Sequence, residues 1–189
     1  MTDHHLIDEI QHVSLAMFRK NFFGVYHGSI SARIDSESFL INTRDAIFDE
    51  ITAASLIRLE HGVEDYRRKT ASLDASIHEE IYQRIPHAKY IAYSMPPYVT
   101  AYTLSHDLFV PKDYFGDSIL GEIRVYDLQE FDGWYRRAPA AIAEYFARHP
   151  GHLMLIKGYG VYAYDRDLTE MAKKIAILEN SARLMMLTC

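Results

Sequence analysis

The chain has 189 residues, 49% of them hydrophobic and 24% charged, and this ordinary globular composition predicts one compact domain over residues 1–189. The formal net charge of −6 argues against nucleic acid as a partner, because affinity for phosphates depends on clustered Lys and Arg. The N-terminal MTDHHLIDEI lacks the basic and apolar segments of a secretory signal, and no apolar run reaches about 18 residues, so we expect a cytoplasmic protein without a membrane partner.

The first predicted elements are a helix and a β-hairpin. Apolar residues with spacings of four, three and four between Leu6 and Met17 form one stripe, which predicts a helix that runs to about Asn21. Residues 25–34 and 38–42 are rich in β-formers and are joined by the polar segment DSE. These two segments therefore predict a hairpin.

The next part of the chain predicts two helices with a less regular stretch between them. Residues 49–60, DEITAASLIRLE, predict a short helix with Thr52 as its N-cap. Residues 58–70 predict a strand and a turn. Residues 73–86 predict a helix that presents isoleucines on one face and ends at a proline, which cannot continue a helix.

The second half of the chain alternates strands with helices. A buried strand over residues 89–95 is followed by a helix over 97–105 that begins with a proline, whose missing N–H has no intrahelical partner in a first turn. Helices at both ends and between strands predict a layered α/β domain. The remaining predicted elements are a strand (121–128), a helix (139–151), a strand, turn and strand (152–164), and a long amphipathic helix from about Asp167.

Three segments resemble the class II aldolase and adducin head-domain family, and the resemblance spans nearly the whole chain. HGSISARI with SFLINTRDAIFDEIT resembles the family's GN-x-S-x-R hairpin and the loop after it. SLDASIHEEIYQRIPHAKYIAYSMPPYVTAYTL and LMLIKGYGVYAYDRDLTEMAKKIAILE resemble its central helix-strand-helix and its C-terminal NHG-containing part. Fuculose-phosphate aldolase, ribulose-phosphate epimerase and methylthioribulose-phosphate dehydratase belong to this family. The resemblance implies a three-layer α/β/α domain with a mixed, mostly antiparallel central sheet, and a homo-oligomer, usually a tetramer.

In typical members two histidines at a strand end and a third in a turn bind a divalent metal, usually zinc, which stabilises an enediolate while a carboxylate handles the proton. The corresponding residues here are Tyr93, Met95 and Tyr159. A phenol titrates near about 10 and a thioether is soft, so neither replaces an imidazole. The single cysteine, Cys189, rules out a cysteine-based zinc site and an intrachain disulfide. We therefore expect no metal and no other cofactor, with a metal site relocated onto other histidines as the alternative.

The resemblance places the family's acid/base carboxylate at Asp74, which could equally be the N-cap of the helix that starts there. Arg44 and His27 could together hold an anion, because a guanidinium offers a planar fork of donors; the alternative is a surface Arg44 paired with Asp45 or Glu50. The histidine of the central helix, His78, is expected to be a satisfied structural group. The other family phosphate-pocket positions fall on Ser29, Thr43 and Ser72.

Two functions remain open at this point. The first is a metal-free binding or assembly domain without the family's aldolase activity. The second is a lyase-, epimerase- or dehydratase-like enzyme for a small sugar phosphate or carbonyl compound, with Tyr93 and Tyr159 as donors to an oxyanion and Asp74 as base. Both predict that Tyr93, Met95 and Tyr159 converge in a cleft beside Asp74, and that this cleft binds a small anion. An oligomer is also expected, from the aromatic residues Tyr114, Phe115, Trp134 and Tyr135.

Overall fold

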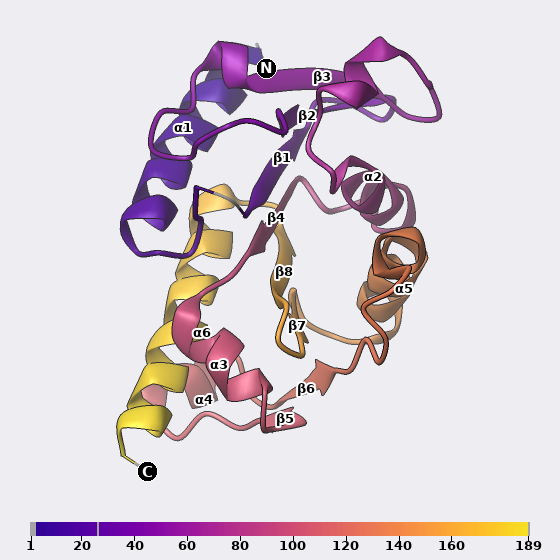
Figure 1. The fold of residues 1–189 in the computed structure, drawn as a ribbon. Helices are drawn as coiled ribbons and strands as arrows, with labels where there is room; N and C mark the ends of the chain where they lie inside the picture. The colour runs from indigo at the N-terminus through magenta and orange to yellow at the C-terminus, as the bar shows by residue number, and fades with distance from the viewer. Residues whose placement is uncertain (1–2, 26, 189) are drawn as a thin grey trace.

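The structure is a computed structural model that describes residues 3–25 and 27–188, so that Cys189 lies outside it. In the described part, eight strands form one sheet in the order β3-β2-β1-β4-β8-β7-β6-β5 (Figure 1). Neighbouring strands are antiparallel, except that β6 and β7 are parallel. The predicted mixed, mostly antiparallel sheet is therefore confirmed. The strands are β1 (Ser29–Arg33), β2 (Ser38–Asn42), β3 (Leu56–Glu60), β4 (Tyr90–Ser94), β5 (Leu108–Phe109), β6 (Ile123–Tyr126), β7 (Leu153–Ile156) and β8 (Gly160–Asp165).

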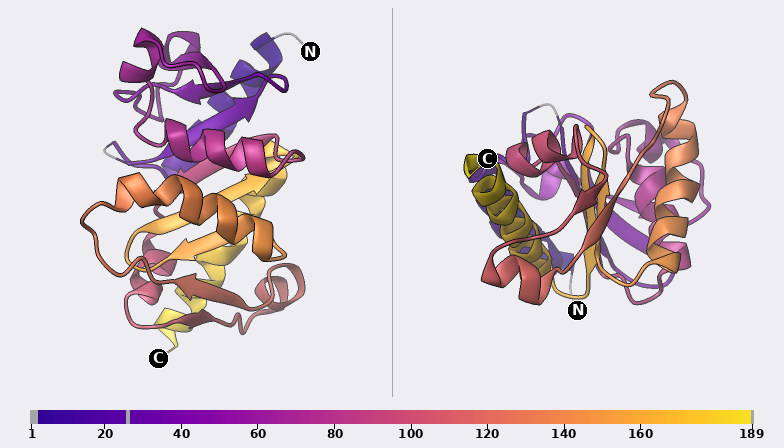
Figure 2. Two further views of the ribbon diagram at one scale, coloured as in Figure 1. Left: turned by 90° about the vertical axis from the view of Figure 1, so that its right-hand side faces the viewer. Right: turned by 90° about the horizontal axis from the view of Figure 1, so that it is seen from below.

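Helices cover both faces of this sheet, which confirms the predicted three layers. Figures 1 and 2 show α1, α3, α4 and α6 on one face and α2 and α5 on the other. No helix of the described residues is both long and apolar enough to cross a membrane. The helices are α1 (Asp3–Arg19), α2 (Ala75–Arg84), α3 (Pro97–Thr103), α4 (Tyr114–Ile119), α5 (Trp134–Arg148) and α6 (Leu168–Leu187), with short 3-10 turns η1 (Ala53–Ser55) and η2 (Tyr66–Lys69).

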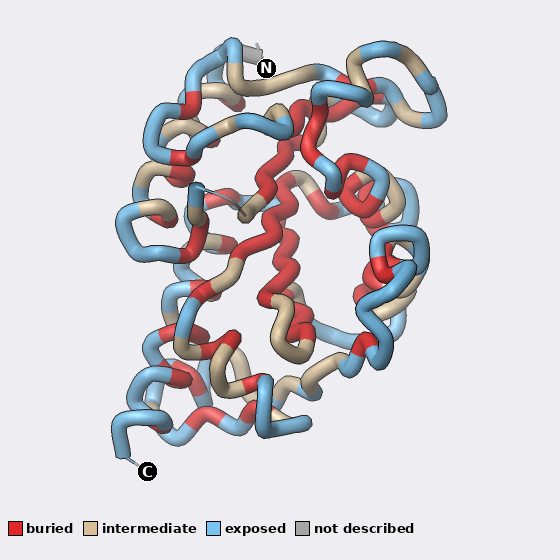
Figure 3. The backbone as a smooth tube through the Cα atoms, viewed as in Figure 1, coloured by how far each residue is buried: buried red, intermediate tan, exposed pale blue. Residues whose placement is uncertain are grey.

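The core lies on both sides of the central strands, which are the most deeply buried part of the chain (Figure 3). Successive side chains of a strand point to opposite faces of the sheet. In β1, Ile30 and Ala32 join the apolar core under α1 and α6. Ser29 and Ser31 point the other way, toward α2. Strand β1 therefore carries polar side chains into the layer that holds α2.

Arg33 continues this polar face of β1 and fixes the C-terminal end of α2. Its guanidinium donates to the carbonyl oxygens of Tyr82 (2.6 Å), Ile85 (3.2 Å) and Ala88 (2.8 Å). The last carbonyl groups of a helix have no intrahelical donor, so these bonds satisfy groups that would otherwise be buried without a partner. The position of α2 relative to β1 is thus set at its C-terminal end by one charged side chain.

The prediction of a helix over residues 49–60 is largely wrong. Thr52 does stand at the N-cap position, but only the single turn η1 (Ala53–Ser55) follows it. Leu56–Glu60 is instead the edge strand β3, which pairs with β2 in the register Asn42↔Leu56. Pairing with an existing strand satisfies the backbone groups of this segment and outweighs its local helix propensity.

Three further features differ from the sequence prediction. Helix α5 begins at Trp134, five residues before the predicted start, with Pro139 inside it. Trp134 is only 3% exposed and Ala138 is fully buried, so packing of the first turn stabilises a helix that contains a proline. The strand β5 and the short helix α4, which begins at an Asp113 side-chain cap, were not predicted. Each is too short to show a periodic pattern.

Candidate functional site

A cavity of about 790 Å³ lies where β4 ends, beside the loop that follows β2 and the turn between β7 and β8. Sequence reasoning missed other lining residues, notably Asn42, Phe48 and Tyr135, since no motif marks them. The expected convergence of Tyr93, Met95 and Tyr159 beside Asp74 is present in the geometry. The predicted site residues that line the cavity are His27, Arg44, Ser72, Asp74, Tyr93, Met95 and Tyr159.

Asp74 forms the floor of the cavity and is 4% exposed. It occupies the N-cap position of α2, but its side chain makes no cap hydrogen bond. The carboxylate Oδ2 instead accepts from the Ser29 hydroxyl at 2.7 Å, and Oδ1 is buried without a well-formed hydrogen bond among the described residues. Burial raises the pKa of Asp74, and hydrogen bonding from Ser29 and Tyr162 opposes that rise. The Asp74 carboxylate therefore lines the cavity and does not cap helix α2.

Stacked tyrosines form the wall beside Asp74. The Tyr93 ring lies 4.9 Å from the rings of both Tyr159 and Tyr162, measured between centroids. The Tyr93 hydroxyl donates to the backbone carbonyl of Tyr159 at 2.7 Å, which engages its only proton. Burial, followed by the nearby Asp74, raises the pKa of Tyr93 and of Tyr159. Both phenols thus stay protonated at neutral pH.

A glycine allows this wall to close. Gly160 begins β8 at φ +139°, a backbone conformation that side chains disfavour. A Cβ at this position would lie 2.4 Å from the carbonyl oxygen of Ser94 and 3.0 Å from the Tyr93 ring. Only a residue without a side chain therefore fits between the end of β4 and the β7–β8 turn.

The side chains at the family's metal positions do not fit zinc. Tyr93 and Tyr159 are protonated phenols with raised pKa values, whereas a metal ligand must offer a free lone pair or an anion. The third position, Met95, offers a soft thioether, which is a weak ligand beside imidazole. Among the described residues, no group of three or more His, Cys, Asp or Glu side chains is placed to hold an ion elsewhere.

Arg44 lies on the rim of the cavity and is fixed through its backbone. Its N–H donates to the carbonyl of Thr70 at 2.9 Å, so the loop that carries it is pinned. The residue is exposed to solvent, and its guanidinium makes no ion pair or hydrogen bond within the described residues. The alternative of a surface pair with Asp45 or Glu50 is thus not found in the structure. A cation is left facing the cavity.

His27 lines the same cavity from the loop before β1. Its Nε2 is buried and has no hydrogen-bond partner within the described residues. Burial lowers the pKa of His27, so the imidazole is neutral near pH 7. Gly24, whose N–H donates to the His27 carbonyl, gives the ring room, since a Cβ there would lie 2.6 Å from it. The cavity thus contains an unsatisfied polar atom in addition to the Arg44 cation.

Two predicted site residues do not line the cavity. Ser29 is fully buried behind Asp74, where it bonds the carboxylate. Thr43 pairs with Ala71 in an isolated bridge that holds the Arg44 loop. His78 is fully buried and hydrogen-bonded to Ser29 and Ser31, in the satisfied state expected for it. The alternating pattern of β1 could have indicated Ser31, because it shares a strand face with Ser29.

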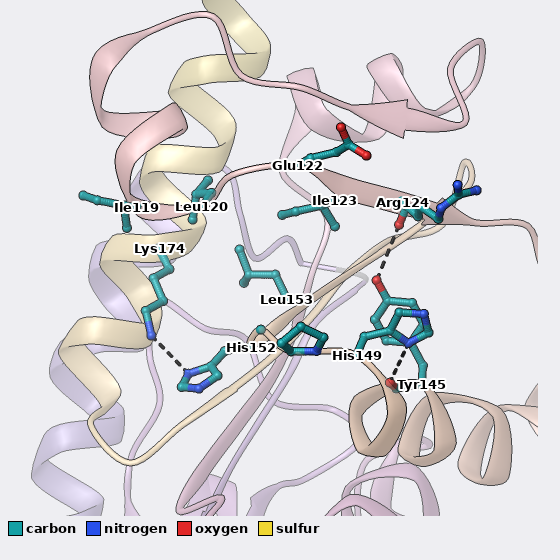
Figure 4. Close-up of a pocket in the computed structure, with 12 residues that line it drawn as sticks. Ile119, Leu120, Glu122, Ile123, Arg124, Tyr145, His149, His152, Leu153 and Lys174 are labelled. Carbon is teal, nitrogen blue, oxygen red and sulfur yellow. Dashed lines mark hydrogen bonds between the residues drawn. The ribbon is translucent and has the colours of Figure 1, made fainter.

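A second cavity, of about 460 Å³, lies at the other end of β7 (Figure 4). Lys174 in its wall donates to Asp165 Oδ2 at 2.6 Å and lies 3.0 Å from His152 Nδ1. Nδ1 of His149, also in the wall, lies 2.9 Å from the Tyr145 carbonyl oxygen. Lys174, His152 and His149 thus have partners, whereas the Glu122 and Arg124 side chains of this cavity have none among the described residues.

The aromatic residues expected at a subunit contact divide into two groups. Tyr114 is 80% and Phe115 62% exposed, so these rings are available for contact, whereas Tyr135, which is 50% exposed, also lines the large cavity. Trp134 is 3% exposed and packs with Tyr126 and Tyr159 at 6.0 Å between ring centroids. Trp134 is thus a core residue.

The chain matches the family model described as "Class II Aldolase and Adducin N-terminal domain" over residues 8–186. No curated protein matches it closely enough to be counted a relative. Among solved structures it is similar to the L-fuculose-1-phosphate aldolase of Thermus thermophilus, with 23% identity and a TM-score of 0.84 over 97% of this chain and 93% of that one. YgbL of Klebsiella pneumoniae is 20% identical with a TM-score of 0.81, covering 99% and 91% of the two chains. The sugar-phosphate aldolase of Thermotoga maritima is 15% identical with a TM-score of 0.72, covering 97% and 94%.

Proposed function

The chain belongs to the class II aldolase and adducin N-terminal domain family, and we propose that its cavity binds a small anionic ligand, such as a sugar phosphate, without a divalent metal. The observation that carries this proposal is the pair of unsatisfied groups on the cavity rim. The Arg44 guanidinium has no ion-pair partner among the described residues, and the buried Nε2 of His27 has no hydrogen bond there. Buried polar atoms are rarely left without a partner, so His27 Nε2 suits a ligand, and the solvent-exposed Arg44 adds a cation beside it that can bond an anion.

The arrangement of the rim and the floor suggests how such a ligand lies. The Arg44 guanidinium suits an anionic group, because it can donate two parallel hydrogen bonds to a phosphate or carboxylate. His27 is positioned to bond a hydroxyl or carbonyl group of the same ligand. The body of the ligand would then reach Asp74 and the stacked tyrosines at the floor. The structural neighbour from T. thermophilus is named for a sugar phosphate, a ligand with an anionic group at one end, as this arrangement requires.

The metal-free part of the proposal follows from the donors at the metal positions. Two phenols with raised pKa values and a thioether do not supply the imidazoles that the family uses. A carboxylate alone does not stabilise an enediolate, and loss of one strong electrostatic stabiliser typically costs about 10²–10³ in rate. We therefore assign this chain a binding or assembly role, with the exposed Tyr114 and Phe115 as support for a homo-oligomer.

Metal-independent proton transfer at the same site is a second candidate function. Its supporting observation is that burial raises the pKa of Asp74, as enzymes do for carboxyl groups that serve as general acids or bases. Of the two tyrosines considered as donors to an oxyanion, Tyr93 already donates its proton to the Tyr159 carbonyl. An enzyme of this kind would thus depend mainly on Asp74.

Metal content and ligand binding test the proposal together. We expect the purified protein to contain far less than one metal ion per chain, and L-fuculose 1-phosphate or a related ketose phosphate to raise its melting temperature. The Arg44→Ala variant should lose that rise, and added zinc should not produce one. Stoichiometric zinc in the purified protein would contradict the metal-free assignment. A rise that Arg44→Ala leaves intact would contradict the assignment of the anion site.

A further inference from the structure

A line of buried polar side chains runs from the cavity floor into the layer between β1 and α2. The Ser29 hydroxyl lies 2.7 Å from Asp74 Oδ2 and 2.9 Å from His78 Nε2. On the other side of the imidazole, Nδ1 lies 2.6 Å from the Ser31 hydroxyl, which is 2.7 Å from the Tyr82 hydroxyl. All these side chains are less than one-tenth exposed. The line is continuous at hydrogen-bond distance.

The proton positions in this line follow from the ionised Asp74 carboxylate, although the Tyr82 hydroxyl at the far end also has a second acceptor, the Lys89 carbonyl at 3.3 Å. The Ser29 hydroxyl donates its only proton to Asp74, so its oxygen accepts from a proton on His78 Nε2. Burial lowers the pKa of His78 to about 3, so the ring is neutral and carries no second proton. Nδ1 therefore accepts from the Ser31 hydroxyl, whose oxygen accepts in turn from the Tyr82 hydroxyl. Every donor in the line points toward the carboxylate.

We propose that His78 is a positioning residue for Asp74: held as the neutral tautomer with its proton on Nε2, it orders a one-way hydrogen-bond chain from Tyr82 to the Asp74 carboxylate. The inference rests on the proposed role of Asp74 as the carboxyl group that meets the ligand. Aligned donors strengthen one another in a medium of low polarity. The hydrogen-bond chain therefore stabilises the ionised form of Asp74 and fixes the orientation of its carboxylate relative to the cavity.

Among the titratable groups around Asp74, Tyr162 also opposes the rise in the pKa of the carboxyl group by hydrogen bonding, and it does so from outside this line. The tyrosines beside it are protonated phenols, and the cation of the cavity, Arg44, lies on the rim. His78 itself meets the edge of the Tyr162 ring at 6.3 Å, and the Arg33 guanidinium lies 4.7 Å from the Tyr82 ring at the far end of the chain. The groups that face Asp74 and His78 are Ser29 and Ser31 from β1, Tyr93 from β4, Tyr159 from the β7–β8 turn, Tyr162 from β8, Tyr135 from α5 and Tyr82 from α2.

Protonation of Asp74 at Oδ2 reverses the whole chain. The new carboxylic acid donates to Ser29, whose hydroxyl turns to His78 Nε2. The imidazole releases its Nε2 proton to solvent and takes up one proton from solvent on Nδ1, and Nδ1–H then donates to Ser31. That hydroxyl turns to Tyr82, whose own hydroxyl donates to the Lys89 carbonyl, already 3.3 Å away. The hydrogen-bond chain as a whole gains one proton, which Asp74 takes from the ligand or from water. The tautomer of His78 therefore indicates whether Asp74 is protonated.

The test is an NMR titration of the free protein, labelled with ¹³C in aspartate carboxyl groups and ¹⁵N in histidine rings. The Asp74 signal is assigned by its loss in Asp74→Asn. We expect His78 to carry its proton on Nε2 at pH 7 and to change to Nδ1 as Asp74 is protonated. In His78→Leu the pKa of Asp74 should rise by about 1, because a donor chain is lost. His78→Gln, which keeps a donor of similar reach, should restore most of that difference.

Further variants separate this role from packing. Ser31→Ala breaks the chain but keeps His78, and it should raise the pKa of Asp74 by less than His78→Leu does. Ser14→Ala removes a buried hydroxyl that has no partner among the described residues, and it should leave the Asp74 titration unchanged. A proton on Nδ1 at pH 7, or the same Asp74 pKa in His78→Leu, Ser31→Ala and the unmodified protein, would overturn the proposal. No ligand is present, so this result is independent of whether the cavity binds a sugar phosphate.

Discussion

The two cavities at opposite ends of β7 differ in how their polar groups are satisfied. In the smaller cavity, Lys174 lies within hydrogen-bond distance of His152 (Figure 4), and Asp165, which is not part of the cavity lining, accepts from Lys174 and lies within hydrogen-bond distance of His152. Arg44 in the larger cavity and Arg124 in the smaller one are both exposed guanidinium groups without a partner among the described residues, so the difference lies in the buried Nε2 of His27, which has no hydrogen bond there. Polar groups that satisfy each other hold elements together, whereas unsatisfied groups are available to a ligand. The pairing of its groups therefore marks a candidate site more clearly than the presence of a cavity does.

The largest expected effect is on ligand binding. Arg44→Met should weaken the binding of a sugar phosphate by about 10- to 100-fold, which corresponds to the 1.5–3 kcal/mol of a hydrogen bond to a charged group. Lys174→Met, in the other cavity, should leave the affinity unchanged. Isothermal titration calorimetry measures both. Equal losses in the two variants would remove the distinction between the cavities.

The next largest effect is on stability, and here Lys174 should matter more than Arg44. Lys174→Met should lower the free energy of unfolding by about 1–3 kcal/mol, because it leaves Asp165, whose side chain is 10% exposed, without its closest partner. Urea denaturation, followed by circular dichroism, provides the measurement, and the C-terminal helix α6 carries the substituted position. An unchanged midpoint would mean that the pair does not hold β8 to α6.

The pH dependence of stability should identify the buried imidazole. Because the pKa of His78 falls to about 3 on folding, the unfolded chain takes up a proton below pH 6.5 that the folded protein does not. The stabilisation is present above pH 6.5 and is lost as the pH falls toward 3, with a slope of up to about 1.4 kcal/mol per pH unit. His78→Gln should remove this contribution, so that its curve is flatter than that of Ser14→Ala. Parallel curves would show that His78 does not titrate in this way.

The smallest expected effect is that of Arg44→Met on stability. Its side chain has no partner among the described residues, so the free energy of unfolding should change by no more than about 0.5 kcal/mol. The same urea series provides the value. A loss of more than about 1 kcal/mol, as expected for a paired cation, would show that Arg44 supports the fold and is not reserved for a ligand.

Element prediction succeeded where a segment is long enough to show a period. The apolar stripe from Leu6 to Met17 predicted α1, and the final amphipathic stretch predicted α6. It failed for Leu56–Glu60, which forms β3 only because β2 offers a partner. The early start of α5 depends likewise on a tertiary contact, the burial of Trp134. Local propensity is a weak guide wherever such contacts compete with it.

The amino-acid sequence by itself determined the order of the elements, the alternation that turns Ser29 and Ser31 toward α2, and the tyrosines and methionine in place of metal ligands. Tertiary structure alone decided which polar groups are satisfied. Among the described residues it left Arg44 without a partner, and it placed the Asp74 carboxylate at the end of a buried hydrogen-bond chain instead of on the backbone of α2. Composition and spacing specify which groups are present, but the partner of a hydrogen bond depends on distances of a few tenths of an ångström between segments far apart in the chain.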